Sequence, residues 1–88
     1  MKIKPGFGLY QVGDEYIIMQ DGSSNVDFSQ IVNLNKTSAI LWQEMERHDF
    51  DAQTLADVLT THFDVSPEDA LNDAQQFIFS MLHEGLIE

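Results

Sequence analysis

The chain changes from strand to helix within Ile31-Val32-Asn33-Leu34-Asn35-Lys36-Thr37-Ser38-Ala39-Ile40-Leu41-Trp42. The short apolar run stops at Asn35. Apolar residues then return with helical spacing, at Ile40, Leu41, Trp42 and Met45. Asn35 is suited to be the N-cap, because its side-chain oxygen can accept from the free amides of the first helical turn. We therefore expect a strand that ends at Leu34 and a helix over about 36–47.

Two segments rich in aromatic and β-branched residues precede this junction, at residues 7–12 and 15–20. They flank Gly13-Asp14, a two-residue link suited to a tight primed turn, and so predict a β-hairpin. A looser turn at residues 21–25 leads to a third predicted strand over residues 26–34. Together these segments predict a three-stranded antiparallel meander.

Two more helices are predicted downstream. Asp51 can cap the second helix, whose apolar face is formed by Leu55, Val58, Leu59 and Phe63. Ser66 can cap the third, with Pro67 at its first position, where the missing N–H is harmless. Gly85 suits the left-handed position just past the end of that helix. We expect the terminal Leu86-Ile87 to pack on the body of the domain as an extended segment.

Length and composition set the class of the molecule. A chain of 88 residues, 43% of them hydrophobic, can enclose a single core and not two. We expect one domain over residues 1–88, of class α+β and winged helix-turn-helix-like, with a three-stranded antiparallel sheet followed by three helices. The chain has no cysteine, no signal-peptide pattern and no apolar run near the ~18 residues of a membrane span. These absences suit a cytoplasmic protein.

Negative charge is concentrated in the second half of the chain. The formal net charge is −11; residues 1–43 hold four acids against three lysines, whereas residues 44–88 hold eleven acids against Arg47 alone. Residues 52–84 contain neither lysine nor arginine, so their potential would repel a phosphate backbone. We do not expect nucleic acid as a partner. The same field would attract a basic peptide or protein surface, although an acidic balance often serves only solubility.

Motifs typical of enzymes are missing from the sequence. There is no glycine-rich phosphate loop, no nucleophile motif and no histidine pair at i, i+4. His48, His62 and His83 lie in different segments, and the paired acids fall where turns and helix starts normally place them. We assign no catalytic, cofactor-binding or metal-binding residue and expect a protein that is not an enzyme.

The third predicted helix has an unusually broad apolar face, which spans roughly 140° of its circumference. The centre of this face is assigned to the core and consists of Ala70, Ala74, Phe77 and Met81. A flank lies beside it and consists of Leu71, Gln75, Ile78 and Leu82. Either the third strand packs over this flank, or the flank is free to contact a partner.

The third strand carries no charge, proline or other device that normally protects a sheet edge from residue 28 to residue 34. If it lies at an edge, an extended peptide can add to it through main-chain hydrogen bonds and insert alternate side chains beside the helix. The occupant is either another peptide or a second copy of the chain.

The order and spacing of several short motifs resemble the PqqD family, named for pyrroloquinoline quinone (PQQ) biosynthesis protein D. These motifs are Glu15-Tyr16, Leu34-Asn35, Thr37, Ala39, Trp42, Leu55, Phe63, Val65-Ser66-Pro67-Glu68, Phe77 and Gly85-Leu86. The resemblance implies a peptide chaperone, or RiPP recognition element, which holds the leader of a ribosomally made precursor peptide. It implies delivery of that peptide to a modifying enzyme, which in PQQ assembly is a radical S-adenosylmethionine protein.

In the family, the leader docks as an added strand against the third strand, beside the third helix. Carried onto this sequence, the resemblance implies peptide-binding residues Phe28, Ser29, Gln30, Ile31 and Val32 on the strand, with Leu71, Gln75, Ile78 and Leu82 on the helix. The chain departs from commoner members in its acidic balance and in Phe79, which falls opposite the core of the helix. Phe79 is either an incidental surface residue or a docking point for an enzyme or second subunit.

Two function classes therefore stand beside the leader-binding adaptor. The first is a winged-helix DNA-binding or transcription-related protein-interaction module, which the domain shape allows and the charge disfavours. The second, ranked last, is a small hydrolase or metal enzyme. PqqD-like domains serve many peptide systems, so the pathway of an adaptor need not be PQQ biosynthesis.

Overall fold

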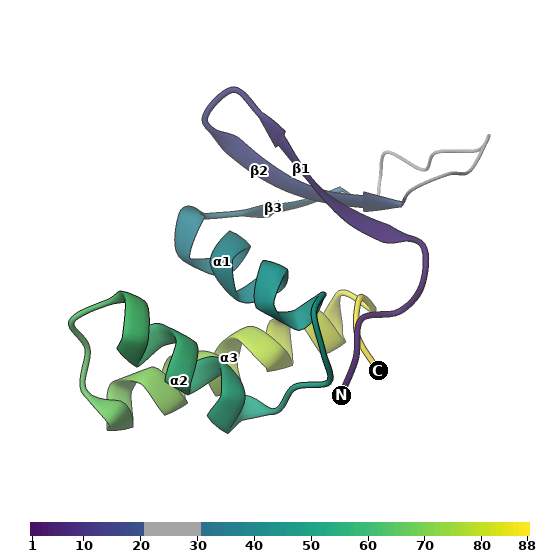
Figure 1. Ribbon diagram of the computed structural model, residues 1–88. Helices are drawn as coiled ribbons and strands as arrows, with labels where there is room; N and C mark the ends of the chain where they lie inside the picture. The colour runs from purple at the N-terminus through teal and green to yellow at the C-terminus, as the bar shows by residue number, and fades with distance from the viewer. Residues whose placement is uncertain (21–30) are drawn as a thin grey trace.

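The structure, a computed structural model, describes residues 1–20 and 31–88. Its elements are β1 (Phe7–Val12), β2 (Glu15–Gln20), β3 (Val32–Leu34), α1 (Lys36–Met45), α2 (Ala52–His62) and α3 (Pro67–His83). Figure 1 shows the sheet on one side of α1 and the paired helices α2 and α3 on the other. The predicted α+β class, with a three-stranded antiparallel sheet followed by three helices, is confirmed.

The sheet is a meander in the order β1-β2-β3. Val12 pairs with Glu15, which leaves Gly13-Asp14 as the predicted two-residue link, and Gly13 has the positive φ (62°) that a primed turn requires. β3 pairs antiparallel with β2, with Ile18 opposite Val32. The strand predicted over residues 26–34 is therefore seen at its C-terminal end, and residues 26–30 lie outside the described part of the chain.

α1 begins where the sequence predicts and ends earlier. The Oδ1 atom of Asn35 accepts a hydrogen bond from the amide of Ser38 at 2.8 Å, so Asn35 is the N-cap. The predicted end at Arg47 is two residues too late, because the helix stops at Met45. The amide of Arg47 bonds instead to the carbonyl of Glu44, three residues before it, which tightens the last turn and ends the α-helical pattern.

The boundaries of α2 and α3 agree with the predicted caps. Asp51 accepts from the amide of Thr54 at 2.8 Å, and Ser66 accepts from the amide of Asp69 at 3.1 Å. Gly85 has a φ of 76°, as the left-handed position after a helix requires. The amide and hydroxyl of Thr54 both donate to the Asp51 carboxylate and lower its pKa, since they stabilise the charged form.

The two ends of the chain pair with each other. Ile3 forms an antiparallel bridge with Ile87, and the amide of Lys4 donates to the carbonyl of Leu86 at 3.0 Å. Leu86 and Ile87 are buried, which confirms that the terminal residues pack on the body as an extended segment. Figure 1 shows the termini side by side below the sheet.

One apolar core joins all of these elements. Its largest fully buried side chains are Trp42, Ile18, Leu55, Leu86 and Ile87. They come from α1, β2, α2 and the C-terminal segment, so a single cluster fixes the sheet against the helices. The prediction that Trp42 belongs to the core is confirmed. Its indole N–H has no hydrogen-bond partner among the residues that the structure describes, which costs part of what the burial of the ring contributes.

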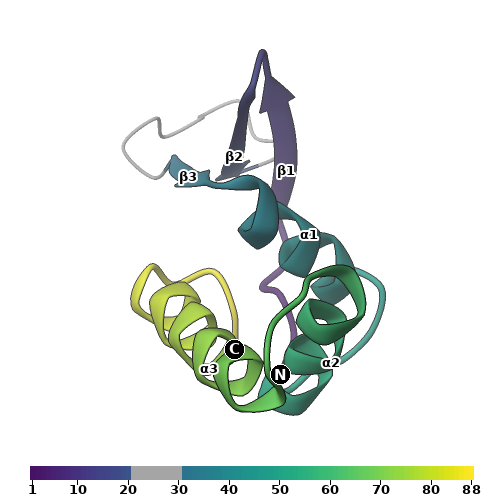
Figure 2. The same cartoon turned by 90° about the vertical axis from the view of Figure 1, so that its left-hand side faces the viewer.

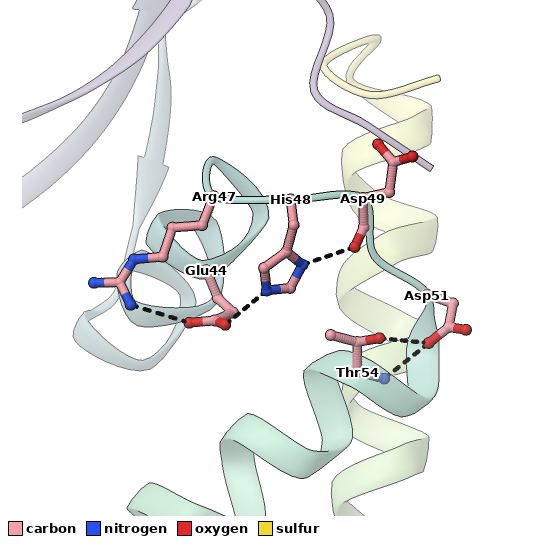
Figure 3. Close-up of polar contacts among 6 residues, drawn as sticks. All are labelled: Glu44, Arg47, His48, Asp49, Asp51 and Thr54. Atoms are coloured by element: carbon pink, nitrogen blue, oxygen red, sulfur yellow. Dashed lines mark hydrogen bonds and ion pairs between the residues drawn. The ribbon is translucent and has the colours of Figure 1, made fainter.

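A set of polar contacts holds the turn between α1 and α2 (Figure 3). The Nδ1 atom of His48 lies 2.8 Å from the carbonyl of Asp49, and its Nε2 atom lies 3.0 Å from the Glu44 carboxylate. Both partners are acceptors, so only the doubly protonated imidazolium can donate to both. The Asp49 carbonyl, and after it the Glu44 carboxylate, therefore raise the pKa of His48 above its ordinary value of 6.5.

The N-cap gives a first prediction. Asn35→Ala should lower the free energy of unfolding by about 0.5–2 kcal/mol, because the amide of Ser38 loses its acceptor. Asn72→Ala is the matched control, since Asn72 is exposed within α3. Urea denaturation monitored by circular dichroism measures both. Equal losses in the two variants would contradict the capping role of Asn35.

The His48 contacts give a second prediction. A pKa raised in the folded state contributes stability that is present below pH 6.5 and is lost as pH rises through the folded value. The free energy of unfolding of the wild type should therefore fall, relative to His48→Gln, as pH rises from about 6 to about 8. Denaturant titrations at several pH values test this. If the unfolding free energies of the two proteins change in parallel with pH across this range, the contacts do not hold the proton on His48.

Candidate functional site

β3 lies at an edge of the described sheet. It pairs with β2 on one side, through Val32, Asn33 and Leu34, and no other described strand lies beyond it. Val32 and Leu34 are half-buried against the core, whereas Asn33 is exposed. Alternate side chains of β3 thus hold the strand in place while its outer main-chain groups face away from β2.

The residues assigned to the strand are only partly described. Val32 begins β3 and Ile31 directly precedes it, and both are half-buried; Phe28, Ser29 and Gln30 lie outside the described residues. The edge also continues to Asn33 and Leu34, which the sequence assignment left out. The predicted end of the strand at Leu34 was the signal that could have included them.

The flank of α3 divides into two parts. Ile78 is 7% exposed and belongs to the core cluster, and Leu71 is half-buried against it. Leu82 is 48% exposed and outside the cluster, and Gln75 is exposed. The residues assigned to the centre of the face, Ala70, Ala74, Phe77 and Met81, are all buried, as the sequence predicts. The open part of the flank is therefore formed by Gln75 and Leu82.

The alternative that β3 packs over the whole flank does not hold at the C-terminal end of α3. β3 packs on α1 and pairs with β2, and α3 packs mainly on α2. Figure 2 shows β3 above α3 on the same side of the molecule, with α1 and α2 on the other side. Leu82, although close in angle to the buried Ile78, keeps nearly half of its surface exposed.

Phe79 adjoins this open part of the flank. It is 73% exposed, and at 100° per residue it falls within about 60° of Leu82 on the helix surface. The two residues are three apart, which places their side chains next to each other on α3. Phe79 and Leu82 thus form an exposed apolar pair bordering the surface assigned to peptide binding, and the sequence assignment had set Phe79 apart from it.

The polar and titratable side chains of the described residues lie at the surface. Among residues 1–20 and 31–88, no polar or charged residue is buried, and no three histidine or acidic side chains gather as metal ligands do. In the same part of the chain, no helix has the length and hydropathy needed to cross a bilayer. What the site does present is a main-chain edge that no other described strand pairs with, and an apolar helix flank, which are the parts needed to bind an extended peptide.

Comparison with known proteins gives one family and two similar structures. The sequence profile of the family described as "Coenzyme PQQ synthesis protein D (PqqD)" matches residues 15–87. No curated protein matches the chain. A structure described as "TbiB1 in Complex with the TbiA(beta) Leader Peptide" is similar with a TM-score of 0.77 and 16% identity, covering 100% of this chain and 95% of that one.

A second structure, described as "Lasso peptide synthetase B1 complexed with the leader peptide", has a TM-score of 0.74 and 20% identity. It covers 99% of this chain and 95% of the other. At these identities the two structures establish a shared fold over essentially the whole length of the chain.

The division of the α3 flank gives a third prediction. Leu82→Lys should change the free energy of unfolding by less than about 0.5 kcal/mol, because Leu82 is half exposed and outside the core cluster. Ile78→Lys should be severely destabilising, since it would bury an unpaired charge. Calorimetry compares the two variants. Global unfolding of Leu82→Lys would assign this residue to the core.

Proposed function

The chain belongs to the PqqD family, and on this basis we propose that it is a non-catalytic adaptor that binds the leader of a ribosomally synthesised precursor peptide by strand addition. The single observation that carries the proposal is the position of β3, which forms the edge of the described sheet on the same side of the molecule as α3, whose flank is partly open. Both similar structures are described as complexes with leader peptides, which supports the same kind of ligand here.

The main chain of β3 supplies the first part of the binding surface. Residues along an edge alternate in the direction of their N–H and C=O groups, so every second residue can bond to an added strand. Each such hydrogen bond contributes only about 0.5–1.5 kcal/mol and carries little sequence information. We assign this role to Ile31 and Val32 and extend it to Asn33 and Leu34, with Phe28, Ser29 and Gln30 retained from the family resemblance.

The α3 flank supplies the selective part. Leu82 and Phe79 are exposed apolar side chains, and covering them releases water from an apolar surface. Gln75 adds a polar group that can hydrogen-bond a leader side chain, whereas Leu71 and Ile78 form the floor against the core. Alternate residues of an added strand point toward one face, so we expect the leader to place apolar residues two apart on this flank.

For leader binding to lead to modification of the precursor, the adaptor must also contact a second protein. We propose that it presents the bound leader to a modifying enzyme, of which a radical S-adenosylmethionine protein is one candidate. We propose that this interaction takes place in the cytoplasm, which suits a chain that has no cysteine. A homodimer through the β3 edge is the competing arrangement, because a second copy would occupy the same main-chain groups.

The test uses leader peptides from short precursor-like reading frames that a search of the neighbouring genes identifies. Isothermal titration should show binding, and a scrambled peptide of the same composition should not bind. Ile31→Pro should weaken binding by roughly two- to ten-fold, because it removes one main-chain donor at the edge. Ile31→Val keeps that donor and should bind as the wild type does.

Amide hydrogen exchange completes the test. Bound leader should slow exchange at alternate residues from Ile31 to Leu34, since their amides gain acceptors. Unchanged affinity in a folded Ile31→Pro variant, together with unchanged exchange along β3, would reject this edge as the binding site. Loss of binding at high protein concentration, with formation of a dimer, would favour the homodimer instead.

A further inference from the structure

A separate cleft lies between the N-terminal segment and the C-terminal end of α1. Residues 2–7 line one side and residues 45–49 line the other, and the cleft has a volume of about 370 Å³. Figure 1 shows the N-terminal segment rising past this end of α1 toward β1. None of the residues assigned to leader binding lines the cleft.

The cleft gathers most of the positive charge of the chain. The protein has four lysines and arginines in all, and three of them, Lys2, Lys4 and Arg47, line this one feature. Two carboxylates, Glu46 and Asp49, also line it, so three fixed positive charges face two negative ones. The lining therefore carries a net charge of +1, whereas the rest of the chain carries −12.

The backbone fixes the direction of the two lysines. The amides of Lys2 and Lys4 donate to the carbonyls of Glu88 and Leu86, both at 3.0 Å, so the segment is extended and tied at both positions. Ile3 packs against the core, which turns the alternate side chains of Lys2 and Lys4 toward the opposite face. Two residues of extended chain separate these side chains by roughly 6.6 Å at their bases.

The cationic groups are available to a ligand. Among the described residues, no carboxylate forms an ion pair with Lys2 or Lys4. Arg47 has a side chain that is 74% exposed, and its one ion pair, with Glu44, is long at 3.8 Å. A guanidinium has five N–H donors, so most of those on Arg47 remain for another acceptor. Lys2 is exposed and Lys4 half-buried, and two cations spaced along an extended segment suit carboxylates that are likewise spaced along a chain.

We propose that this cleft binds an acidic segment of a partner protein in extended conformation, with carboxylates at alternate positions contacting Lys2 and Lys4 and a further carboxylate contacting Arg47. The spacing favours a peptide over a small anion, because the two lysines follow the segment instead of converging on one point. The site lies apart from β3 and the α3 flank, so an adaptor could hold its leader and a carboxylate-bearing partner at the same time. The inference does not depend on the leader-binding proposal.

The test uses a short peptide with glutamate at alternate positions, and the same peptide with glutamine as its control. Titration of the full chain, followed by amide chemical shifts, should move the signals of residues 2–7 and 45–49 with the glutamate peptide only. Lys2→Gln, Lys4→Gln and Arg47→Gln should each weaken binding by roughly two- to five-fold, as expected for exposed ion pairs. Lys36→Gln is the matched control, since Lys36 is the one lysine or arginine of the sequence that does not line the cleft.

A variant that is expected to tighten binding distinguishes an effect on binding from an effect on folding. Glu46→Gln removes a carboxylate from the lining and should tighten binding by roughly two-fold, which a destabilised protein would not do. Equal weakening by Lys36→Gln, no shift at the cleft with the glutamate peptide, or weaker binding of Glu46→Gln would each overturn the proposal. If inorganic phosphate binds at the cleft as tightly as the peptide does, the cleft is a simple anion site and the proposed peptide site is wrong.

Discussion

The whole structure depends on the burial of one apolar cluster in a chain that has no covalent cross-link. Trp42 and Ile18 are completely buried in it, and Leu55 and the C-terminal Leu86-Ile87 complete the contact between sheet, helices and chain ends. A small domain with a single core has no second layer to cover its sheet. The half-buried side chains of β3 accordingly pack against the core, and its outer main-chain groups lie at the edge of the described sheet.

Local chemistry made much of the fold predictable from the sequence. Asn35, Asp51 and Ser66 cap the helices and Gly85 ends the last one, because each of these effects acts within a few residues. The end of α1 was misplaced, since no glycine or proline marks it and a single bond from Arg47 to Glu44 decides it. Periodicity gave the angular position of the α3 flank. It could not give the coverage of that flank, which depends on neighbours distant in sequence and leaves Ile78 buried while Leu82 is open.

The difference between local effects and contacts distant in sequence also explains why the basic cleft was not predicted. Lys2 and Lys4 are separated from Arg47 by more than forty residues. Hydrogen bonds between Met1 and Phe50, together with the pairing of the N-terminal segment with the C-terminal one, bring them to the end of α1. The acidic balance of the chain, which disfavours nucleic acid, also conceals this local reversal of sign. The main-chain edge with the apolar α3 flank on one side and the charged cleft on another are two chemically different surfaces of a small protein.

The bridge between Ile3 and Ile87 has an architectural consequence. The two ends of the chain leave the domain at neighbouring points, with the amide of Lys2 bonded to the carbonyl of Glu88 at 3.0 Å. Such a unit can be spliced into a surface loop of a larger protein without a long spacer, because the host chain need only enter and leave at one place. Its orientation on the host would then be set by two short tethers side by side, which restrain rotation more than a single tether does.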